Sequence, residues 1–235
     1  MAELSMFETL MSLPLFKGAS HEQIALFVEK THLSFNSYEP GEMIVVASDV
    51  CRNVCCLLSG TMSLEHPVFF GNIIVREVVG QGRFLGVEKL FGLDNRFSMS
   101  ARALVKCGIM EFSKNQYLTL LQSNQIFLMN SLNYISRHAQ KCESVIAEGY
   151  HDSLLSVIVH IIETRTSAES RRICIESTRV PLLEYLSSMV SSASSQLDTL
   201  CEAGLVRSVT DYKLEILSRE QLINAYRHNA GGGGL

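Results

Sequence analysis

The polar residues with the most distinctive spacing form a serine-rich stretch in the last quarter of the chain. From Ser187 to Ser195, six of nine residues are serine, and Gln196 follows them. Hydroxyl and amide groups can hydrogen-bond to phosphates and to the edges of bases, so the stretch is a candidate for nucleic-acid contact. Its only charge from Val190 to Leu200 is Asp198, which phosphates repel, so affinity would depend on cations from neighbouring segments.

The seven cysteines and seven histidines lack the spacing of a metal or redox site. Cys55 and Cys56 are consecutive in a predicted strand, which directs their side chains to opposite faces of a sheet. We interpret the cysteines as reduced, buried thiols. The sequence also lacks a phosphate-binding loop, a dinucleotide fingerprint and a nucleophile elbow. We therefore expect no enzyme activity, no metal and no cofactor.

The composition indicates a globular protein with a sizeable core. Hydrophobic residues make up 47% of the 235 residues and charged residues 19%, which excludes general disorder. The net charge is −4 and neither half of the chain is basic, which counts against strong nucleic-acid binding. No apolar run is long enough to span a membrane, and the acidic N-terminus is unlike a secretory signal. We expect a cytoplasmic protein with no membrane partner.

The N-terminal half changes from a helical to a strand pattern near residue 33. Residues 5–31 are expected to be helical, with a capping box formed by Ser20 and Gln23. Short runs rich in β-branched and aromatic residues then follow between turn signals, over 43–47, 54–58, 61–64, 68–79, 100–105 and 107–112. Strands at this spacing are typical of a barrel, a roll or a sandwich.

A second capping box, Ser113 and Gln116, predicts the start of a long helix that reaches Gly149, which fits a hinge or a C-cap. Apolar residues recur along one face of this helix at spacings of four and three: Leu128, Leu132, Ile135, Ala139, Cys142 and Ile146. Such a seam needs another helix to bury it. It either packs against its own domain or pairs with a second copy. Because polar residues flank it for several turns, we favour a parallel homodimer.

The C-terminal residues alternate between helix and strand patterns in the order of a winged helix-turn-helix. We expect helices over 152–164, 181–186 and 191–203, strands over 173–175, 206–209 and 214–217, and a final helix from a third capping box at Ser218 and Gln221. In that fold the second helix of the pair enters the major groove and the hairpin touches the DNA backbone. The candidate DNA contacts are Arg179, Ser191, Ser192, Ser194, Ser195, Gln196, Arg207 and Lys213.

Four segments resemble the Crp–Fnr family of transcription regulators, in that family's order. Tyr38–Ile44 and Leu57–Gly60 are similar to motifs of its β-roll, Phe84–Gly86 to the start of its effector-phosphate segment, and Leu182–Val206 to its helix-turn-helix. The resemblance covers about residues 10–228. It implies an α+β protein with an N-terminal β-roll of the cupin-like, cyclic-nucleotide-binding type, a long dimerisation helix and a C-terminal winged helix-turn-helix.

The effector segment departs from the family's cyclic-nucleotide binders. Those have Glu after the glycine for the ribose, and Arg before Ser or Thr for the phosphate; Val87 and Phe97 stand at these places. Glu88 and Arg96 each lie one residue away from the positions of the family's Glu and Arg. In a strand, a difference of one residue turns the side chain to the other face, unless a local shift of the backbone brings it back. We expect an unknown, more apolar effector than cyclic AMP, or none. The candidate effector residues are Phe84, Gly86, Val87, Glu88, Arg96, Phe97 and Ser98, and Phe69, Phe70 and Phe91 either add lining or are ordinary core.

The recognition helix departs from the family as well. Family members offer an Arg at its start and another in its middle, where this chain has Val190 and Ser195. The missing cations remove the counterion-release contribution to affinity. Arg207 and Lys213, on the predicted hairpin, could touch the DNA backbone or could be ordinary surface charges.

These observations divide the chain into four parts. Residues 1–112 form the expected effector-binding β-roll domain with its N-terminal helices, 113–149 the dimerisation helix and hinge, 150–229 the winged helix-turn-helix, and 230–235 a glycine-rich tail. The favoured function is an effector-responsive transcription regulator that binds DNA as a homodimer. Two alternatives remain: a regulator of the same fold that binds a protein partner and has lost DNA recognition, and a cyclic-nucleotide receptor with a shifted pocket.

Overall fold

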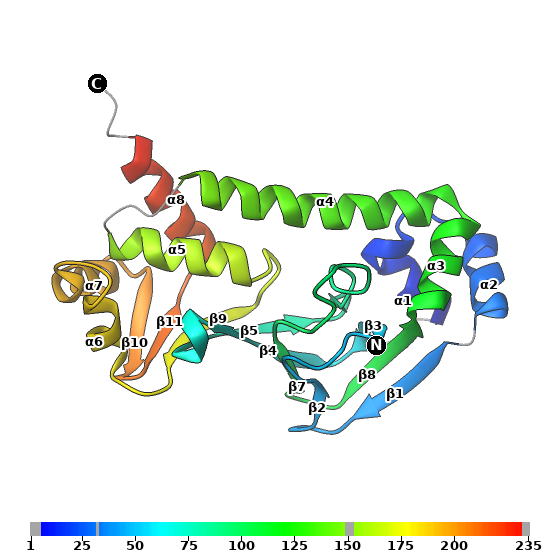
Figure 1. Cartoon of the computed structure of the whole chain (residues 1–235), viewed down its shortest axis with the longest axis horizontal. Coiled ribbons are helices and arrows are strands. Elements are labelled where there is room, and N and C mark those ends of the chain that lie inside the picture. The colour runs from blue at the N-terminus through cyan, green and yellow to red at the C-terminus, as the bar shows by residue number, and fades with distance from the viewer. Residues whose placement is uncertain (1–5, 32, 149–152, 232–235) are drawn as a thin grey trace. The chain divides into compact units, whose positions relative to one another are not determined.

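The computed structural model describes residues 6–31, 33–148 and 153–231. The chain divides into two compact units (Figure 1). The first unit comprises Met1–Ser63 and Gly80–Gln140, and the second comprises Leu64–Val79 and Lys141–Leu235. Each unit is described by itself below.

Short helices open the first unit. They are α1 (Met6–Ser12), the 3₁₀ turn η1 (Pro14–Phe16) and α2 (His21–Lys30). The expected capping box is confirmed, because the Ser20 hydroxyl accepts from the Gln23 amide while the Gln23 side chain accepts from the Ser20 amide. Phe16 and Phe27 from these segments meet Phe127 at ring-centroid distances of 5.6 and 6.3 Å, which gives this end of the unit an aromatic core.

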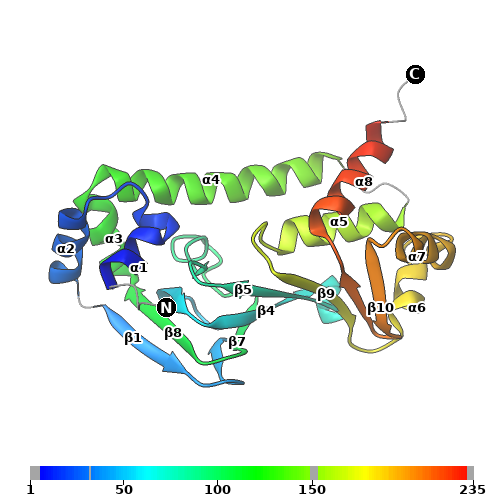
Figure 2. The same ribbon diagram turned by 180° about the vertical axis from the view of Figure 1, so that it is seen from behind.

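The strands of the first unit form a β-sandwich (Figure 2). One sheet has the order β1 (Ser34–Tyr38), β8 (Cys107–Ser113), β3 (Asn53–Ser59) and β6 (Phe84–Leu85), all antiparallel. β2 (Met43–Val45) pairs antiparallel with β7 (Ser100–Ala103) in the second sheet. β1 and β6 were not among the predicted strands. The side chains of β1 are mostly exposed, and β6 has two residues, so neither has a strong apolar alternation.

The long helix expected from Ser113 is interrupted. The second capping box is confirmed, and α3 (Lys114–Ser123) begins at it. Asn124 then has an extended backbone, with φ −158° and ψ 136°, which ends α3. Its side-chain oxygen accepts from the amide of Ile126 at 2.8 Å, so Asn124 also satisfies the first turn of α4 (Gln125–Glu148). Gly149 lies outside the described residues.

The second unit combines a sheet with helices that follow α4. Its elements in chain order are α5 (Leu154–Arg165), β9 (Arg172–Ser177), α6 (Leu182–Ser187), α7 (Ala193–Glu202), β10 (Val206–Thr210), β11 (Lys213–Ile216) and α8 (Arg219–Gly231). Within this unit the sheet order is β10, β11, β9, β5 (Ile73–Gly80) and β4 (Thr61–Val68). Apolar residues of α5, α6, α7 and α8 pack in one core with the inward faces of the strands. The Ser218 hydroxyl accepts from the amide of Gln221, which is one half of the third expected capping box.

One hairpin of the N-terminal half belongs to the second unit. β4 (Thr61–Val68) begins in the first unit and, after the turn η2 (Phe69–Gly71), β5 (Ile73–Gly80) returns to it. The segment 68–79, expected as one strand run, is therefore the end of β4, a turn and β5. β5 pairs antiparallel with β9, from Ile73 opposite Ser177 to Val78 opposite Arg172. This pairing was not predicted from the sequence.

Candidate functional site

The candidate effector segment begins at a glycine that the fold requires. Gly86 has φ +91°, a backbone conformation that side chains disfavour. A Cβ at this position would lie 2.7 Å from the Cys51 Sγ, 3.0 Å from the Asn53 carbonyl oxygen and 3.3 Å from the Phe97 ring. The segment after β6 therefore packs closely against Cys51 and β3 on one side and against Phe97, later in the same segment, on the other.

Gly86→Ala is expected to lower the free energy of unfolding by about 2–4 kcal/mol, because the cost of a positive φ for alanine is added to the cost of the steric overlap of its Cβ with the neighbouring atoms. Gly41 is the matched control, since it has φ +93° and a Cβ added there would meet nothing within 4 Å. Gly41→Ala should cost only the backbone strain, about 1 kcal/mol. Urea denaturation followed by circular dichroism measures both, and equal costs would contradict the tight packing around Gly86.

The residues that replace the family's ribose and phosphate ligands lie inside the protein. Val87 and Phe97 are buried, whereas Glu88, Arg96 and Ser98 are exposed. The Arg96 guanidinium donates to the Ser48 carbonyl at 2.7 Å on the surface. A buried phosphate needs a charge-assisted Arg facing it. In this structure Glu88 and Arg96 are on the surface, and the apolar Phe97 ring packs beside Gly86.

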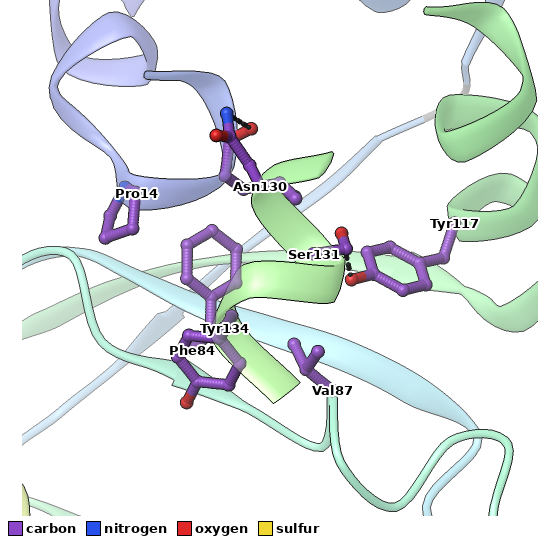
Figure 3. A pocket seen from close by; sticks show the side chains of 8 residues that line it. Pro14, Phe84, Val87, Tyr117, Asn130, Ser131 and Tyr134 are labelled. Atoms are coloured by element: carbon purple, nitrogen blue, oxygen red, sulfur yellow. Dashed lines mark hydrogen bonds between the residues drawn. The ribbon is translucent and has the colours of Figure 1, made fainter. Parts of the chain in front are cut away.

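A small cavity lies between this segment and α4 (Figure 3). Its volume is about 20 Å³, room for a single water molecule. The Tyr117 hydroxyl and the Ser131 hydroxyl form a hydrogen bond of 2.7 Å at its wall. Burial raises the pKa of Tyr117, so this hydroxyl stays protonated. The full lining is Pro14, Leu15, Phe84, Val87, Tyr117, Asn130, Ser131 and Tyr134.

The other phenylalanines proposed as pocket lining have different places. Phe91 stacks on Tyr117 with ring centroids 6.0 Å apart and is itself partly exposed, with the Lys114 ammonium 4.9 Å from its ring centre. Phe69 belongs to the second unit and packs against Tyr185. The side chain of Phe70 lies outside the described residues. Phe84 and Val87 are thus the candidate effector residues that line the cavity.

The cysteines near the effector segment are packed thiols. Cys51 donates to the carbonyl oxygens of Gly86 and Asn53 at 3.6 and 3.5 Å. Burial raises the pKa of Cys51 to about 11 and that of Cys55 to about 12, and it raises the pKa of Cys56 as well. Thiols with raised pKa values carry little thiolate at neutral pH and are weak nucleophiles. Among the described residues, no three metal-ligating side chains gather in one place.

An apolar face of α4 is open to solvent. Leu128, Leu132 and Ile135 are 38%, 48% and 37% exposed, and Met129 beside them is 46% exposed. Ala139 is exposed on the same face, whereas the side chains of Cys142 and Ile146 lie outside the described residues. The first turns of the seam are therefore not buried by their own domain, and their apolar surface is available to another helix.

The serine-rich stretch lies at the start of α7, with its hydroxyls outward. Ser191, Ser192, Ser194 and Ser195 are exposed, and α7 begins at Ala193 rather than at the expected Ser191. Val190 is buried in the core of the second unit. The place where the family has its first Arg therefore faces inward here, so a cation there could not reach a phosphate without local rearrangement.

Gln196 was proposed as a DNA contact, but its side chain is already engaged. Its Oε1 accepts from the amide of Leu154 at 2.7 Å, and its Nε2 donates to the Ser191 carbonyl at 3.1 Å. The amide thus satisfies one of the free N–H groups at the start of α5 and ties α5 to α7. Reading a base would require breaking these bonds.

The cations of the β10–β11 hairpin are paired with carboxylates. Arg207 of β10 and Arg172 of β9 both bind the buried carboxylate of Glu215, and Lys213 lies 2.6 Å from Glu176. The hydrogen bond from Arg207, with that from Arg172, lowers the pKa of Glu215. Arg179 is exposed before α6 and has no carboxylate partner among the described residues. Paired cations contribute less counterion release than free ones, so the expected affinity for a polyanion falls further.

The comparisons with known proteins agree with the architecture of the first unit. Residues 35–124 match the family described as cyclic nucleotide-binding domain. The chain is similar in structure to the Catabolite Activator Protein of Thermus thermophilus, with a TM-score of 0.52 and 18% identity over 90% of this chain and 97% of that chain. It also matches the sensor domain of the transcriptional regulator DNR from Pseudomonas aeruginosa, with a TM-score of 0.46 and 19% identity over 56% of this chain and 91% of that chain.

The N-terminal part of the chain therefore has the cyclic nucleotide-binding fold, and the chain is similar in fold to the Catabolite Activator Protein of Thermus thermophilus. No curated protein matches the sequence. Among the described helices, none is both long and apolar enough to cross a membrane.

Proposed function

We propose that the protein is a cytoplasmic transcription regulator of the Crp–Fnr type that binds DNA as a homodimer. The observation that carries the proposal is the series α5, β9, α6, α7, β10, β11 and α8, which follows a cyclic nucleotide-binding fold and a long helix. Two helices joined by a short turn and followed by a two-stranded hairpin are the elements of a winged helix-turn-helix. In this proposal α7 lies in the major groove, its exposed serines contact DNA, and the β10–β11 hairpin lies on the backbone.

Dimerisation through α4 is part of the proposal. The exposed face of Leu128, Leu132 and Ile135 has the spacing of a coiled-coil seam, and pairing with a second copy would bury it. A two-fold dimer would place two α7 helices on half-sites about 34 Å apart, one turn of DNA. A palindromic site is the expected target.

Leu132→Glu is expected to convert the protein to a monomer at micromolar concentration and to abolish binding to a palindromic site. Two charges would face each other in an apolar seam, where unpaired charges are costly. Asn133→Glu is the control, because Asn133 is also exposed on α4 but lies off the seam. Sedimentation velocity measures the assembly state. A Leu132→Glu variant that remains a dimer would show that α4 is not the interface.

A protein partner in place of DNA is the second candidate, and the charges of the second unit favour it. α7 has no Lys or Arg, and Arg207 and Lys213 are paired with carboxylates. Exposed serines can contact a protein as well as DNA. Binding to a partner that changes little between low and physiological salt, with no DNA affinity at either, would establish this candidate and exclude the first.

Cyclic nucleotides are not the expected effectors. Phe97 and Val87 occupy the places of the polar ligands, and the cavity between the segment and α4 holds about 20 Å³. Isothermal titration with cyclic AMP and cyclic GMP at millimolar concentration is expected to give no heat of binding. Saturable heat with either nucleotide would restore the cyclic-nucleotide receptor and require a rearranged Phe97.

A further inference from the structure

The β4–β5 hairpin supplies part of the core of the second unit. Val68, Ile73 and Val75 belong to the same apolar cluster as Ile173 and Ile175 of β9. Ile73 and Val75 are 1% and 0% exposed, so the hairpin is not resting on a finished surface. Removing apolar side chains from water is the dominant favourable contribution to folding, so the hairpin stabilises the unit that it completes.

Ion pairs join the opposite face of the hairpin to β9 and β11. Arg76 of β5 binds Glu65 of β4 at 3.4 Å and Glu176 of β9 at 3.2 Å. Glu176 in turn binds Lys213 of β11 at 2.6 Å. The charges therefore alternate in sign across four neighbouring strands, which favours this register of the β5–β9 pair over others.

A buried carboxylate fixes the far end of β5. Glu77 is fully buried, and its Oε1 lies 3.1 Å from the His66 Nε2. Its Oε2 accepts from the amide of Ser167 at 2.8 Å and from the Ser170 hydroxyl. Ser167 and Ser170 lie in the connection between α5 and β9. A buried carboxylate with several donors specifies one arrangement, because leaving any of these groups without a partner is costly.

The turn of the hairpin reaches α6. The Phe69 ring packs against Tyr185 of α6 with centroids 6.0 Å apart. The Thr178 hydroxyl donates to the carbonyls of Gly71 and Asn72, and the Thr178 amide donates to Asn72 at 3.0 Å. The hairpin is thus held along its whole length, from the start of α6 to the end of α5.

We propose that the β4–β5 hairpin is a strand-addition lock, through which the N-terminal domain sets the arrangement of the C-terminal elements. The hairpin lies inside the segment 35–124 that matches the cyclic nucleotide-binding family, yet its contacts complete the other unit. Only Gln81–Arg83 separate the end of β5 from β6 and the candidate effector segment. A displacement of that segment is transmitted along the backbone to β5, and from β5 to β9 and α6. The regulatory role of the hairpin rests on the proposed function. The docking of the hairpin on β9 and α6 does not depend on that function.

A disulfide tests whether the hairpin is docked in solution. Arg76 stands opposite Cys174 of β9, and paired residues of antiparallel strands are about 5 Å apart, within reach of a disulfide. Arg76→Cys in the full-length protein is expected to cross-link to Cys174 nearly completely under mild oxidation, as mapped by peptide mass. Arg76→Cys with Cys174→Ala should form none at this position. Absence of the cross-linked peptide that joins positions 76 and 174 would overturn the docked arrangement, and its formation supports it.

Hydrogen exchange tests whether the lock holds the second unit. Glu77→Gln is expected to raise the exchange rates of amides in 167–177 at least tenfold, while amides of β1 and β8 exchange as before. Glu39→Gln is the control, because Glu39 forms an exposed ion pair with Lys106 in the first unit. Unchanged exchange in 167–177 would overturn the lock. Hydrogen exchange is measured without DNA. A protein that does not bind DNA could therefore still show the docked hairpin, and unchanged exchange would not contradict DNA binding.

Discussion

Glu77→Ala is expected to lower the free energy of unfolding of the second unit by about 2–4 kcal/mol, because it removes the acceptor at the centre of a buried hydrogen-bond network, and each buried polar group left unsatisfied costs about 1–3 kcal/mol. The substitution removes the acceptor of the Ser167 amide, one of the two acceptors of the Ser170 hydroxyl, and the hydrogen-bond partner of the His66 ring. Urea denaturation of the full-length protein, with hydrogen exchange to identify the unit that opens, measures the loss.

The matched control is Glu39→Ala, which removes an exposed carboxylate whose pairing with Lys106 should contribute no more than about 1 kcal/mol. A second comparison separates the pair from simple cavity formation. His66→Ala combined with Glu77→Ala should cost less than the sum of the two single variants, because each single change strands the other partner. Strictly additive costs, or a Glu77→Ala cost below about 1 kcal/mol, would contradict the network.

Ser195→Arg is expected to strengthen DNA binding about tenfold or more, because an Arg on α7 can reach a guanine edge or a phosphate, and one good bidentate contact is worth about 1–3 kcal/mol. Ser195 is exposed, and its hydroxyl makes only a local bond to the Ser192 carbonyl. The slope of affinity against salt should also steepen by about one counterion. Fluorescence anisotropy with a selected duplex at several salt concentrations measures both quantities.

Ser37→Arg controls for net charge, since it adds the same cation to an exposed position on β1, which is not among the proposed DNA-binding elements. It should change affinity by less than twofold and leave the salt slope unaltered. If both variants bind equally well, the gain reflects charge alone and α7 is not the recognition helix.

Local patterns predicted most of the elements, whereas the pairing between distant strands was not predictable. The capping boxes at Ser20 and Ser113 are visible in the sequence, because their donors and acceptors are three residues apart. The break at Asn124 has a weaker signal, since an Asn can begin a helix or lie within one. The β-branched and aromatic run over 68–79 indicated strand structure, but the identity of β9 as the neighbour of β5 depends on the tertiary fold.

The candidate sites were predictable in part, for the same reason. The loss of polar ligands at Val87 and Phe97 follows from residue type, and both side chains are buried. The engagement of Gln196 was not predictable, because its bond to Leu154 joins two helices that are distant in sequence. Glu77 was missed, although a signal exists: it occupies an inward position of an otherwise apolar strand face, where an unpaired charge would be costly.

Selection of DNA sequences with the purified full-length protein, at low and at physiological salt, tests the proposed function most directly. The proposal predicts a palindromic site with half-sites one helical turn apart, and an affinity that falls as salt increases. The serines of α7 and the paired cations of the β10–β11 hairpin predict modest affinity and a shallow salt slope. No enriched site at either salt concentration would contradict DNA binding and would leave the protein-partner regulator as the account of this fold.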